Sequence, residues 1–376
     1  MRYITDFVKS SLLKRAVFVG GPRQVGKTTF ALNFIGPSVT ARHPAYLNWD
    51  HAPTALKIRR SELPLDQPVL VFDELHKFHT WKRWIKGVLD VERGQRKIIV
   101  TGSARLDLYK KGGDSLFGRY RYVRLHPFSL NEFSNGNPTQ KHLDRLLIFG
   151  GFPEPLFSQD RRELRLWQRE RVHRVIREDV RELSMIQNLS GLEMLAEALP
   201  ERVGNPLSIQ NLSEDLQVDH KTAKRWIEVL DSMYYSYRIS PFGAPKIRAV
   251  KKEQKLYLWD WSTISNEGCR WENLVASQLL KYCHWIEDSE GDAMELRFLR
   301  DTDKREVDFV VLRNKKPIFA VECKTGEKAV SHAIHYFAER TSIPVFYQVH
   351  RGQASWGNER VKVMPFVEFC KALGMP

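Results

Sequence analysis

Short apolar runs alternate with helical stretches through the first third of the chain. They lie at AVFVG from residue 16, AYLNW from 45, PVLVF from 68, KIIVT from 97 and YRYVRL from 120. Because these runs lack the polar alternation of a half-exposed strand, they are typical of strands buried on both faces. The pattern predicts an α/β domain at residues 1–135, with a parallel sheet covered by helices.

The middle of the chain, residues 136–268, has mainly helical periodicity. Eight arginines lie between residues 161 and 181, and acidic neighbours at helical spacing explain most of them as a solvated helix face. LSIQNLSEDLQVDHKTAKRWIEVL predicts a helix-turn-helix, with Asp219 capping the second helix. We expect YYSYRISPF and KLYLWDW to form the wing of a winged helix. The outward face of the second helix would contact DNA or, alternatively, another protein.

The last part of the chain, residues 269–376, returns to an α/β pattern. A helix from about Arg270 to Tyr282 precedes expected strands at ELRFLR, EVDFVVL and PIFAVECK, and a further helix and strand follow. The turn-rich SNGNPTQK and the nearby GGFPEP indicate the boundary after the first domain. The sequence therefore predicts three domains.

Charge is distributed unevenly over these regions. The formal net charge is +14, and residues 1–135 hold 23 Lys and Arg against 11 Asp and Glu, an excess of 12. The counts are 21 against 19 in residues 136–270 and 15 against 15 in residues 271–376. A basic excess attracts polyanions, above all nucleic acid. The alternative is a surface that charge keeps soluble.

Composition also limits the compartment and the metal chemistry. The four cysteines have no CxxC spacing, so neither a disulfide framework nor a zinc site is expected. No segment approaches the roughly 18 uninterrupted apolar residues of a membrane span. The N-terminus lacks the features of a secretory signal. We expect a cytoplasmic protein with no membrane partner.

The segment GPRQVGKT follows an apolar run and opens a helical stretch, which is the context of a P-loop. Backbone N–H groups of such a loop surround phosphates, the lysine reaches the β and γ phosphates, and the threonine hydroxyl binds Mg²⁺. The predicted ATP-binding residues are Gly21, Pro22, Arg23, Gln24, Val25, Gly26, Lys27, Thr28 and Thr29.

Further residues of the predicted site follow later strands. PVLVFDE places Asp73 and Glu74 at the carboxyl end of a strand, where Asp73 would bind Mg²⁺ and Glu74 would act as general base. At the end of KIIVTGS, Thr101 or Ser103 would sense the γ-phosphate or position the water. Arg119, in SLFGR, is either an arginine finger acting across a subunit interface or an ordinary surface arginine.

Taken in order, several motifs together resemble one known group. GPRQVGKTT, LVFDELHK, VTGSARL, S-L-x-G-R, LHPFSLNEF and GGFPEP are similar to the AAA-type ATPases of bacteria and archaea that carry a C-terminal domain of unknown function. The resemblance covers nearly the whole chain. It implies an AAA-like core and assembly as a ring or another homo-oligomer.

The C-terminal region resembles the restriction-endonuclease-like nuclease core. Asp308 in EVDFVV and the E-x-K pair Glu322 and Lys324 follow a helix that contains Glu272. Residues i and i+2 of a strand share a face, so Glu322 and Lys324 should project together. Glu272, Asp308 and Glu322 would bind Mg²⁺ while Lys324 orients the attacking water. The alternatives are a turn cap and a chance E-x-K string.

These observations lead to two functional hypotheses. The first is a Mg-ATP hydrolysing ATPase that acts on DNA, with branched or processed DNA as a suggested substrate and a nuclease-like C-terminal domain. The second is an ATP-dependent signalling or toxin-antitoxin-like switch whose C-terminal half binds proteins. The near-neutral charge of residues 136–376 favours this second hypothesis.

Overall fold

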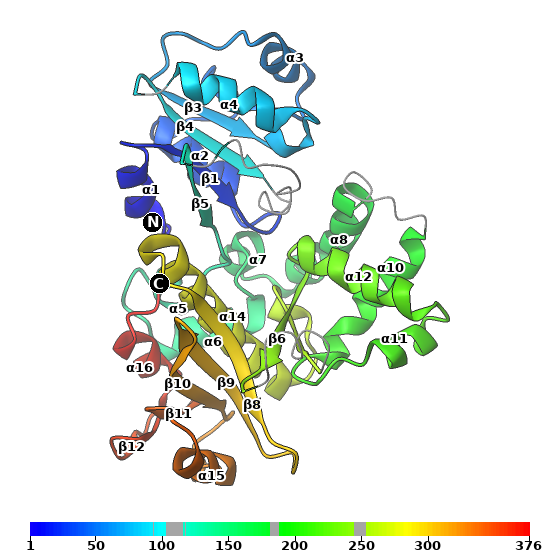
Figure 1. The fold of residues 1–376 in the computed structure, drawn as a ribbon, viewed down its shortest axis with the longest axis vertical. Helices are drawn as coiled ribbons and strands as arrows, with labels where there is room; N and C mark the ends of the chain where they lie inside the picture. The colour runs from blue at the N-terminus through cyan, green and yellow to red at the C-terminus, as the bar shows by residue number, and fades with distance from the viewer. Residues whose placement is uncertain (93, 103–115, 117, 181–187, 244–252) are drawn as a thin grey trace. The chain divides into compact units, whose positions relative to one another are not determined.

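The computed structural model describes residues 1–376 apart from 93, 103–115, 117, 181–187 and 244–252 (Figure 1). The chain divides into two compact units. The first is formed mainly by Met1–Pro127 and includes Ser232–Tyr234. The second holds Phe128–Arg177, Ile186–Asp231 and Tyr235–Pro376. The predicted domain boundaries near residues 135 and 268 stay predictions.

A five-stranded parallel sheet forms the centre of the first unit, in the order β2-β3-β4-β1-β5. All five strands coincide with the apolar runs of the sequence, so the α/β prediction is confirmed. β1 and β3 are buried along their whole length, as expected for strands covered on both faces. Their bounds are β1 Ala16–Gly20, β2 Tyr46–Asn48, β3 Val69–Asp73, β4 Lys97–Gly102 and β5 Tyr120–Arg124.

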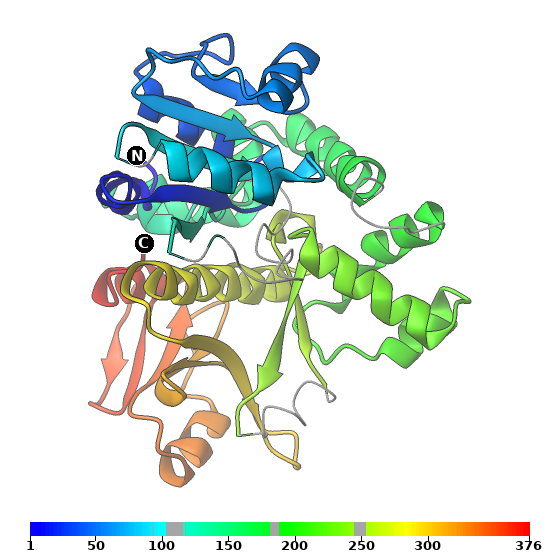
Figure 2. The same ribbon diagram turned by 45° about the horizontal axis from the view of Figure 1, so that its top comes forward.

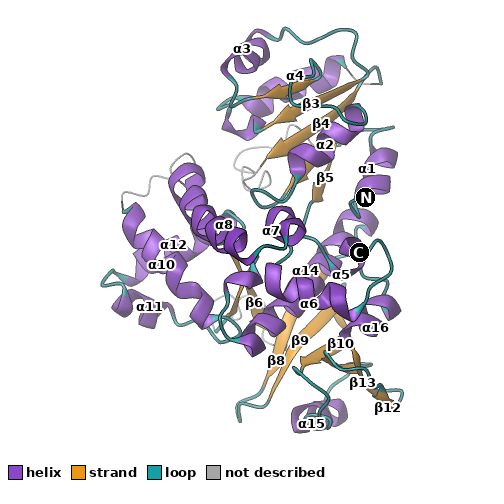
Figure 3. Ribbon diagram, turned by 180° about the vertical axis from the view of Figure 1, so that it is seen from behind, coloured by secondary structure: helices purple, strands orange, loops and turns teal. Residues whose placement is uncertain are grey.

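Helices cover both faces of this sheet. α4 lies on one face in Figure 1, and α2 lies on the opposite face, seen from behind in Figure 3. The α4 side of the core contains Phe18, Phe72, Trp81 and Ile85. The helices are α1 Thr5–Ser11, α2 Lys27–Ile35, α3 Ala52–Arg60 and α4 Trp81–Val91, with a 3-10 turn at Leu75–Lys77.

The second unit begins with helices. They are α5 Leu130–Phe133, α6 Gln140–Phe149, α7 Pro153–Ser158, α8 Arg161–Arg174, a π-helical turn Val175–Val180, α10 Leu189–Ala198, a 3-10 turn Leu199–Arg202, α11 Ile209–Asp215, α12 His220–Ser232 and a 3-10 turn Trp261–Thr263. Arg171 of α8 is buried over the ring of Phe152, 4.4 Å from its centroid. This arginine is therefore an exception to the predicted solvated face.

α11 and α12 occur where the sequence predicts a helix-turn-helix. The carboxylate of Asp219 accepts hydrogen bonds of 2.9 and 3.0 Å from the amides of Lys221 and Thr222, as a helix cap does. Trp226 and Leu230 are buried, because they lie on the apolar face of α12. His220, Lys221, Lys224 and Arg225 are exposed on the other face.

An eight-stranded mixed sheet completes the second unit, in the order β12-β13-β11-β10-β9-β8-β6-β7. The long helix α14, Glu267–Glu290, packs on β8, β9 and β10 (Figure 2). The other elements are β6 Ser236–Pro241, β7 Lys255–Leu258, β8 Met294–Arg300, β9 Glu306–Arg313, β10 Lys316–Cys323, α15 His332–Arg340, β11 Phe346–His350, β12 Trp356–Gly357, β13 Val361–Pro365 and α16 Phe366–Ala372.

The two strands expected to form a wing belong to the C-terminal sheet. β6 and β7 pair antiparallel, as a wing would. However, Ser240 and Pro241 of β6 also pair with Arg297 and Phe298 of β8. The pair thus extends the C-terminal sheet, and its backbone groups are used there. Within the part of the chain that the structure describes, no helix has the length and apolar character needed to cross a membrane.

Candidate nucleotide site and C-terminal carboxylate cluster

The loop between β1 and α2 has the backbone of a phosphate-binding turn. Gly21 has a φ of 151° and Gly26, directly before α2, has a φ of 94°, in the left-handed region where glycine is favoured. A Cβ on Gly21 would lie 2.3 Å from the carbonyl oxygen of Leu125, so no side chain fits there. The backbone conformation therefore favours glycine at both predicted positions.

Lys27 and Thr28 open α2 at the end of this loop. The Lys27 side chain is buried, and its Nζ donates to the carbonyl oxygens of Gly21 and Pro22 at 3.0 and 2.7 Å. The ammonium group is thus held within the turn that would surround phosphates. The hydroxyl of Thr28 donates to Oδ2 of Asp73 at 2.7 Å. P-loop and strand β3 meet at this hydrogen bond.

Asp73 is the centre of a buried hydroxyl network. Besides Thr28, the Tyr46 hydroxyl donates to Oδ2 at 2.5 Å, and the Thr101 hydroxyl donates to Oδ1. Burial and the adjacent Asp73 carboxylate raise the pKa of Tyr46, so this phenol stays protonated. The sequence predicted Thr101 as a residue of the site, and its role toward the γ-phosphate or the water stays a prediction. Tyr46 was missed because its apolar strand context gives no sign of a polar role. Ser103, the other predicted residue, lies outside the described residues.

Glu74 follows Asp73 in a left-handed conformation with a φ of 54°. Its amide donates to Oδ1 of Asp73 at 3.1 Å. Its carboxylate Oε2 lies 3.7 Å from Nε2 of His76 and 4.0 Å from Nζ of Lys77. Burial, followed by the nearby Lys77, lowers the pKa of His76 to about 3. His76 is therefore neutral near pH 7.

Arg119 lies just before β5. Its Nε donates to Oδ1 of Asp90, in α4, at 2.7 Å, and 36% of its side chain is exposed. A partly exposed guanidinium in an ion pair is consistent with both predicted alternatives for Arg119. Its role as an arginine finger stays a prediction.

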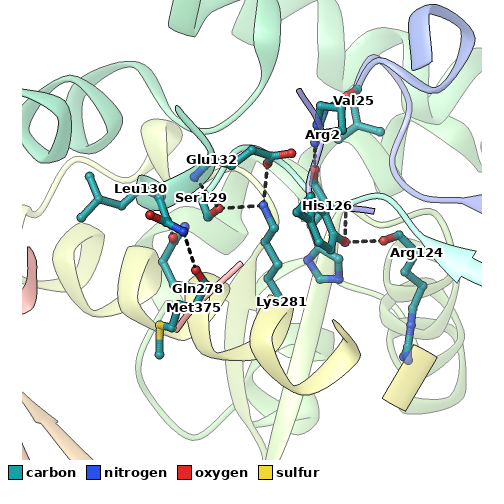
Figure 4. Close-up of polar contacts among 12 residues, drawn as sticks. Arg2, Val25, Arg124, His126, Ser129, Leu130, Glu132, Gln278, Lys281 and Met375 are labelled. Atoms are coloured by element: carbon teal, nitrogen blue, oxygen red, sulfur yellow. Dashed lines mark hydrogen bonds and ion pairs between the residues drawn. The ribbon is translucent and has the colours of Figure 1, made fainter. Parts of the chain in front are cut away.

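The N-terminal segment contacts the P-loop, which the sequence did not indicate. The Arg2 guanidinium donates to the carbonyl oxygen of Val25 at 2.8 Å and to that of His126 (Figure 4). The Tyr3 hydroxyl donates to the carbonyl of Arg124. These bonds join the start of the chain, the P-loop and the end of β5 within the first unit. Each of these bonds joins residues that are far apart in the sequence, so no local motif could have predicted them.

A different set of contacts involves FSLNEF, the part of the LHPFSLNEF segment that lies in the second unit. Lys281 of α14 donates to Oε2 of Glu132 at 2.6 Å and to Oγ of Ser129 at 2.8 Å (Figure 4). Both charged side chains of this pair are 1% exposed. The side-chain oxygen of Gln278 accepts from the amide of Leu130 at 2.9 Å. This part of the motif therefore fastens α5 to α14.

The predicted nuclease-like residues lie together in the second unit. The Cys323 amide donates to Oδ2 of Asp308 at 2.8 Å, which places Asp308 of β9 beside the end of β10. Nζ of Lys324 donates to Oε1 of Glu322 at 2.7 Å, so these two side chains share a face as predicted. Burial, followed by the Asp308 charge, raises the pKa of Glu322 and of Glu272.

Lys255 of β7 is a further member of this cluster that the sequence did not single out. Its Nζ lies 3.4 Å from Oε1 of Glu272 and 3.8 Å from Oδ1 of Asp308, and it also pairs with Glu306. Burial alone lowers the pKa of Lys255, but the three carboxylates together raise it above its usual value. A lysine within the otherwise apolar KLYLW run was the available signal.

The two candidate metal sites differ in their ligands. Thr28 and Asp73 present a hydroxyl and a carboxylate at one point, and hard oxygen ligands of this kind, completed by phosphates, suit Mg²⁺. Across the described residues, no group of three or more His, Cys, Asp or Glu side chains is arranged to hold a metal ion. The metal role predicted for Glu272, Asp308 and Glu322 stays a prediction.

The parallel sheet, the glycine turn and the Thr28–Asp73 contact define a P-loop α/β domain. Residues 13–134 match the family model described as AAA domain. Residues 140–266 match a domain of unknown function, DUF8612, and residues 267–369 match another, DUF4143. The AAA part of the predicted resemblance is confirmed, and the restriction-endonuclease-like part stays a prediction.

Relatives of the chain occur in archaea and bacteria. A protein of Methanocaldococcus jannaschii is 24% identical over 297 residues, 69% of this chain and 65% of the relative. A protein of Mycobacterium tuberculosis is 21% identical over 280 residues, 70% of this chain and 62% of the relative. The chain thus spans less than two thirds of these two relatives.

Two solved structures are similar to parts of the chain. The Aeropyrum pernix ORC1 protein in complex with DNA is 13% identical, with a TM-score of 0.33, over 74% of this chain and 94% of that one. The Thermotoga maritima RuvB Holliday junction branch migration motor is 15% identical, with a TM-score of 0.32, over 62% and 88%.

Proposed function

We propose that this chain is an AAA-type ATPase that hydrolyses Mg-ATP and couples hydrolysis to an action on DNA. The hydrogen bond between Thr28 and Asp73 is the observation that carries the ATPase proposal. It brings a hydroxyl from the P-loop and a carboxylate from strand β3 to one point. That pair, beside the enclosed Lys27 ammonium, is what binding of a nucleoside triphosphate with its metal requires.

In the proposed mechanism, the loop from Gly21 to Gly26 binds the phosphates through its N–H groups and the N-terminus of α2. Lys27 would leave the carbonyls of Gly21 and Pro22 and bind the β and γ phosphates. Thr28 and Asp73 would hold Mg²⁺, which when bound neutralises charge on the phosphate oxygens. Glu74 would then orient and deprotonate the attacking water.

Glu74 would have to turn toward the phosphates from its present neighbours. Its carboxylate lies beside His76 and Lys77, and the contact to Lys77 is long at 4.0 Å. Lys77 also has a second partner, because its Nζ donates to Oδ2 of Asp50 at 2.8 Å. The Lys77 ammonium therefore keeps a counter-ion when Glu74 leaves it, which lowers the cost of the movement.

Two charge distributions support DNA as the partner. The first is the excess of 12 positive charges within residues 1–135, where 23 Lys and Arg stand against 11 Asp and Glu. The second is the exposed face of α12 with Lys221, Lys224 and Arg225. In a helix-turn-helix, the second helix is the one that enters the major groove. Branched DNA is the substrate we suggest, and a homo-oligomer the assembly.

Phosphate release and DNA binding, measured together, test this proposal. We expect the full chain to release phosphate without an added acceptor, faster with forked or four-way-junction DNA than without DNA. Neutralising Lys221, Lys224 and Arg225 together should weaken binding and lower the salt slope by about one for each DNA phosphate that these side chains neutralise. Neutralising the exposed Lys141, in the same unit, is the matched control.

The outcomes separate the two functional hypotheses. Phosphate release that no DNA stimulates, together with no salt-sensitive binding of linear, forked or junction DNA, would leave the ATPase standing and overturn the DNA proposal. The ATP-dependent switch would then be favoured, and nucleotide-dependent assembly without DNA would be its signature. If DNA binds but neutralising Lys221, Lys224 and Arg225 has no effect, the basic residues 1–135 would be the DNA-binding surface instead of α12.

A further inference from the structure

Lys255 lies beside carboxylates that are predicted to bind a metal ion in the C-terminal domain. The lysine begins β7 and is 1% exposed. Its Nζ lies 3.4 Å from Glu272 of α14 and 3.8 Å from Asp308 of β9. Those two carboxylates are two of the three predicted metal ligands. A divalent ion shared by them would have to lie beside a positively charged ammonium group.

Each of the three predicted ligands also accepts a hydrogen bond from the chain itself. The Tyr257 hydroxyl donates to Oε1 of Glu272 at 2.7 Å, and the Cys323 amide donates to Oδ2 of Asp308 at 2.8 Å. Lys324 binds Oε1 of Glu322 at 2.7 Å. Oε2 of Glu322 is buried without a hydrogen-bond partner in the described chain. The chain thus satisfies one oxygen of each carboxylate, and Lys255 places a positive charge next to two of the three carboxylates.

We propose that Lys255 is the resident cation of this carboxylate cluster and that its ammonium keeps divalent metal ions out. In this arrangement the E-x-K pair does not form the centre of a metal-dependent nuclease. The cluster instead joins β7, α14 and β9, because Lys255 bridges carboxylates from the helix and from β9 while Tyr257 binds the helix from the same strand. This inference goes beyond the proposed ATPase and does not depend on it.

Manganese binding tests the proposal, with Mn²⁺ as a paramagnetic probe. The full chain would carry Asp73→Asn, so that the nucleotide site lacks its charged metal ligand, and would be titrated without nucleotide. We expect no saturable Mn²⁺ site in this protein. Lys255→Met should create a saturable site that binds Mn²⁺ at least about tenfold more tightly than the Lys255 protein does. The reason is that a positive charge next to the ligands is removed. Adding Asp308→Asn should abolish the new site.

Lys255→Arg is the matched control, because it keeps the charge and should leave the Mn²⁺ affinity at the low level of the Lys255 protein. A saturable Mn²⁺ site in the Lys255 protein that Asp308→Asn or Glu272→Gln removes would overturn the proposal. This second measurement needs no substitution at Lys255, so it decides the question even where Lys255→Met fails to fold. Failure of phosphate release in the Asp73-intact chain would instead concern the proposed ATPase alone.

Discussion

The hydroxyl of Thr28 donates a 2.7 Å hydrogen bond to Oδ2 of Asp73, although 45 residues separate them in the chain. Thr28 lies in the first turn of α2, and Asp73 ends β3. In a parallel sheet, the carboxyl ends of neighbouring strands lie at one edge, and a helix that starts there directs its first turn to that edge. The sheet topology thus brings the two predicted metal ligands together.

Substitution at either end of this hydrogen bond should remove ATP hydrolysis. We expect Asp73→Asn to lower the rate of phosphate release by roughly 100-fold or more, because a charged oxygen ligand of Mg²⁺ is removed. Thr28→Ala should have a similar effect, and Thr28→Ser should retain most of the rate because the hydroxyl is kept. Steady-state phosphate release at saturating Mg-ATP measures this. Equal rates for the alanine and serine variants would contradict a metal-binding role of the hydroxyl.

Glu74→Gln should separate nucleotide binding from hydrolysis. A general base contributes about 10²- to 10⁴-fold to a rate, so hydrolysis should fall by that order while ATP binding stays unchanged. Binding of a fluorescent ATP analogue and phosphate release from the same preparation measure the two properties. Glu62→Gln, which removes an exposed acid of the same unit, is the control. A glutamine variant that hydrolyses at the normal rate would exclude Glu74 as the base.

Arg119 can be tested as a finger that acts across a subunit interface. Arg119→Ala alone and Lys27→Ala alone should both be inactive, the first by roughly 10³-fold or more. Mixing them should restore activity, since an intact Arg119 would then serve an intact P-loop in a neighbouring subunit. Asp90→Asn removes the negative charge of the 2.7 Å partner of the guanidinium and should not reduce the rate. Two inactive variants that stay inactive when mixed would favour the ordinary surface arginine.

Much of the first unit could be predicted, because its signals are local. Apolar runs gave all five strands of the parallel sheet, and the glycine spacing gave the turn before α2. The contacts of Arg2 with Val25 and of Tyr46 with Asp73 could not be predicted. They join segments that are distant in sequence, and an arginine or tyrosine carries no pattern that indicates its partner.

The second unit shows a different limit of sequence reasoning. The strands of the expected wing were located correctly. The local sequence does not specify, however, which other strand will pair with the free edge of such a hairpin. β6 therefore joined β8 as well as β7. In the same way, E-x-K spacing placed Glu322 and Lys324 on one face, yet it could not indicate that Lys255 enters the cluster from β7.

The buried pair Lys281 and Glu132 should be important for stability. Both side chains are 1% exposed, so removing one leaves the other charge buried and unpaired. Lys281→Met should lower the free energy of unfolding by about 3–5 kcal/mol. Adding Glu132→Leu should recover part of that decrease. Urea unfolding followed by tryptophan fluorescence measures both.

The matched control for that pair is the exposed ion pair of Arg174 and Glu170, 2.8 Å apart in the same unit. Arg174→Met should cost at most about 1 kcal/mol, because water screens the pair and solvates the remaining carboxylate. Equal decreases from Lys281→Met and Arg174→Met would contradict the importance of burial. A double variant less stable than Lys281→Met would show that Glu132 has a further stabilising partner.

His76 should make the stability of the first unit depend on pH. Burial lowers its pKa from 6.5 to about 3, so the folded unit holds the neutral imidazole while the unfolded chain takes up a proton below pH 6.5. The stabilisation is therefore complete above about pH 6.5 and declines as pH falls toward 3, by at most about 1.4 kcal/mol per pH unit. Urea unfolding at pH 5, 6 and 7 measures the slope.

The substitution His76→Phe should flatten this pH dependence, because the group that takes up the proton on unfolding is removed. Neither ring nitrogen of His76 has a hydrogen-bond partner among the described residues, so phenylalanine gives up no such bond. The exposed His79→Phe serves as the control, because its ring is already solvated in the folded chain. If the slope between pH 5 and 7 survives in His76→Phe and disappears in His79→Phe, the buried imidazole is not its source.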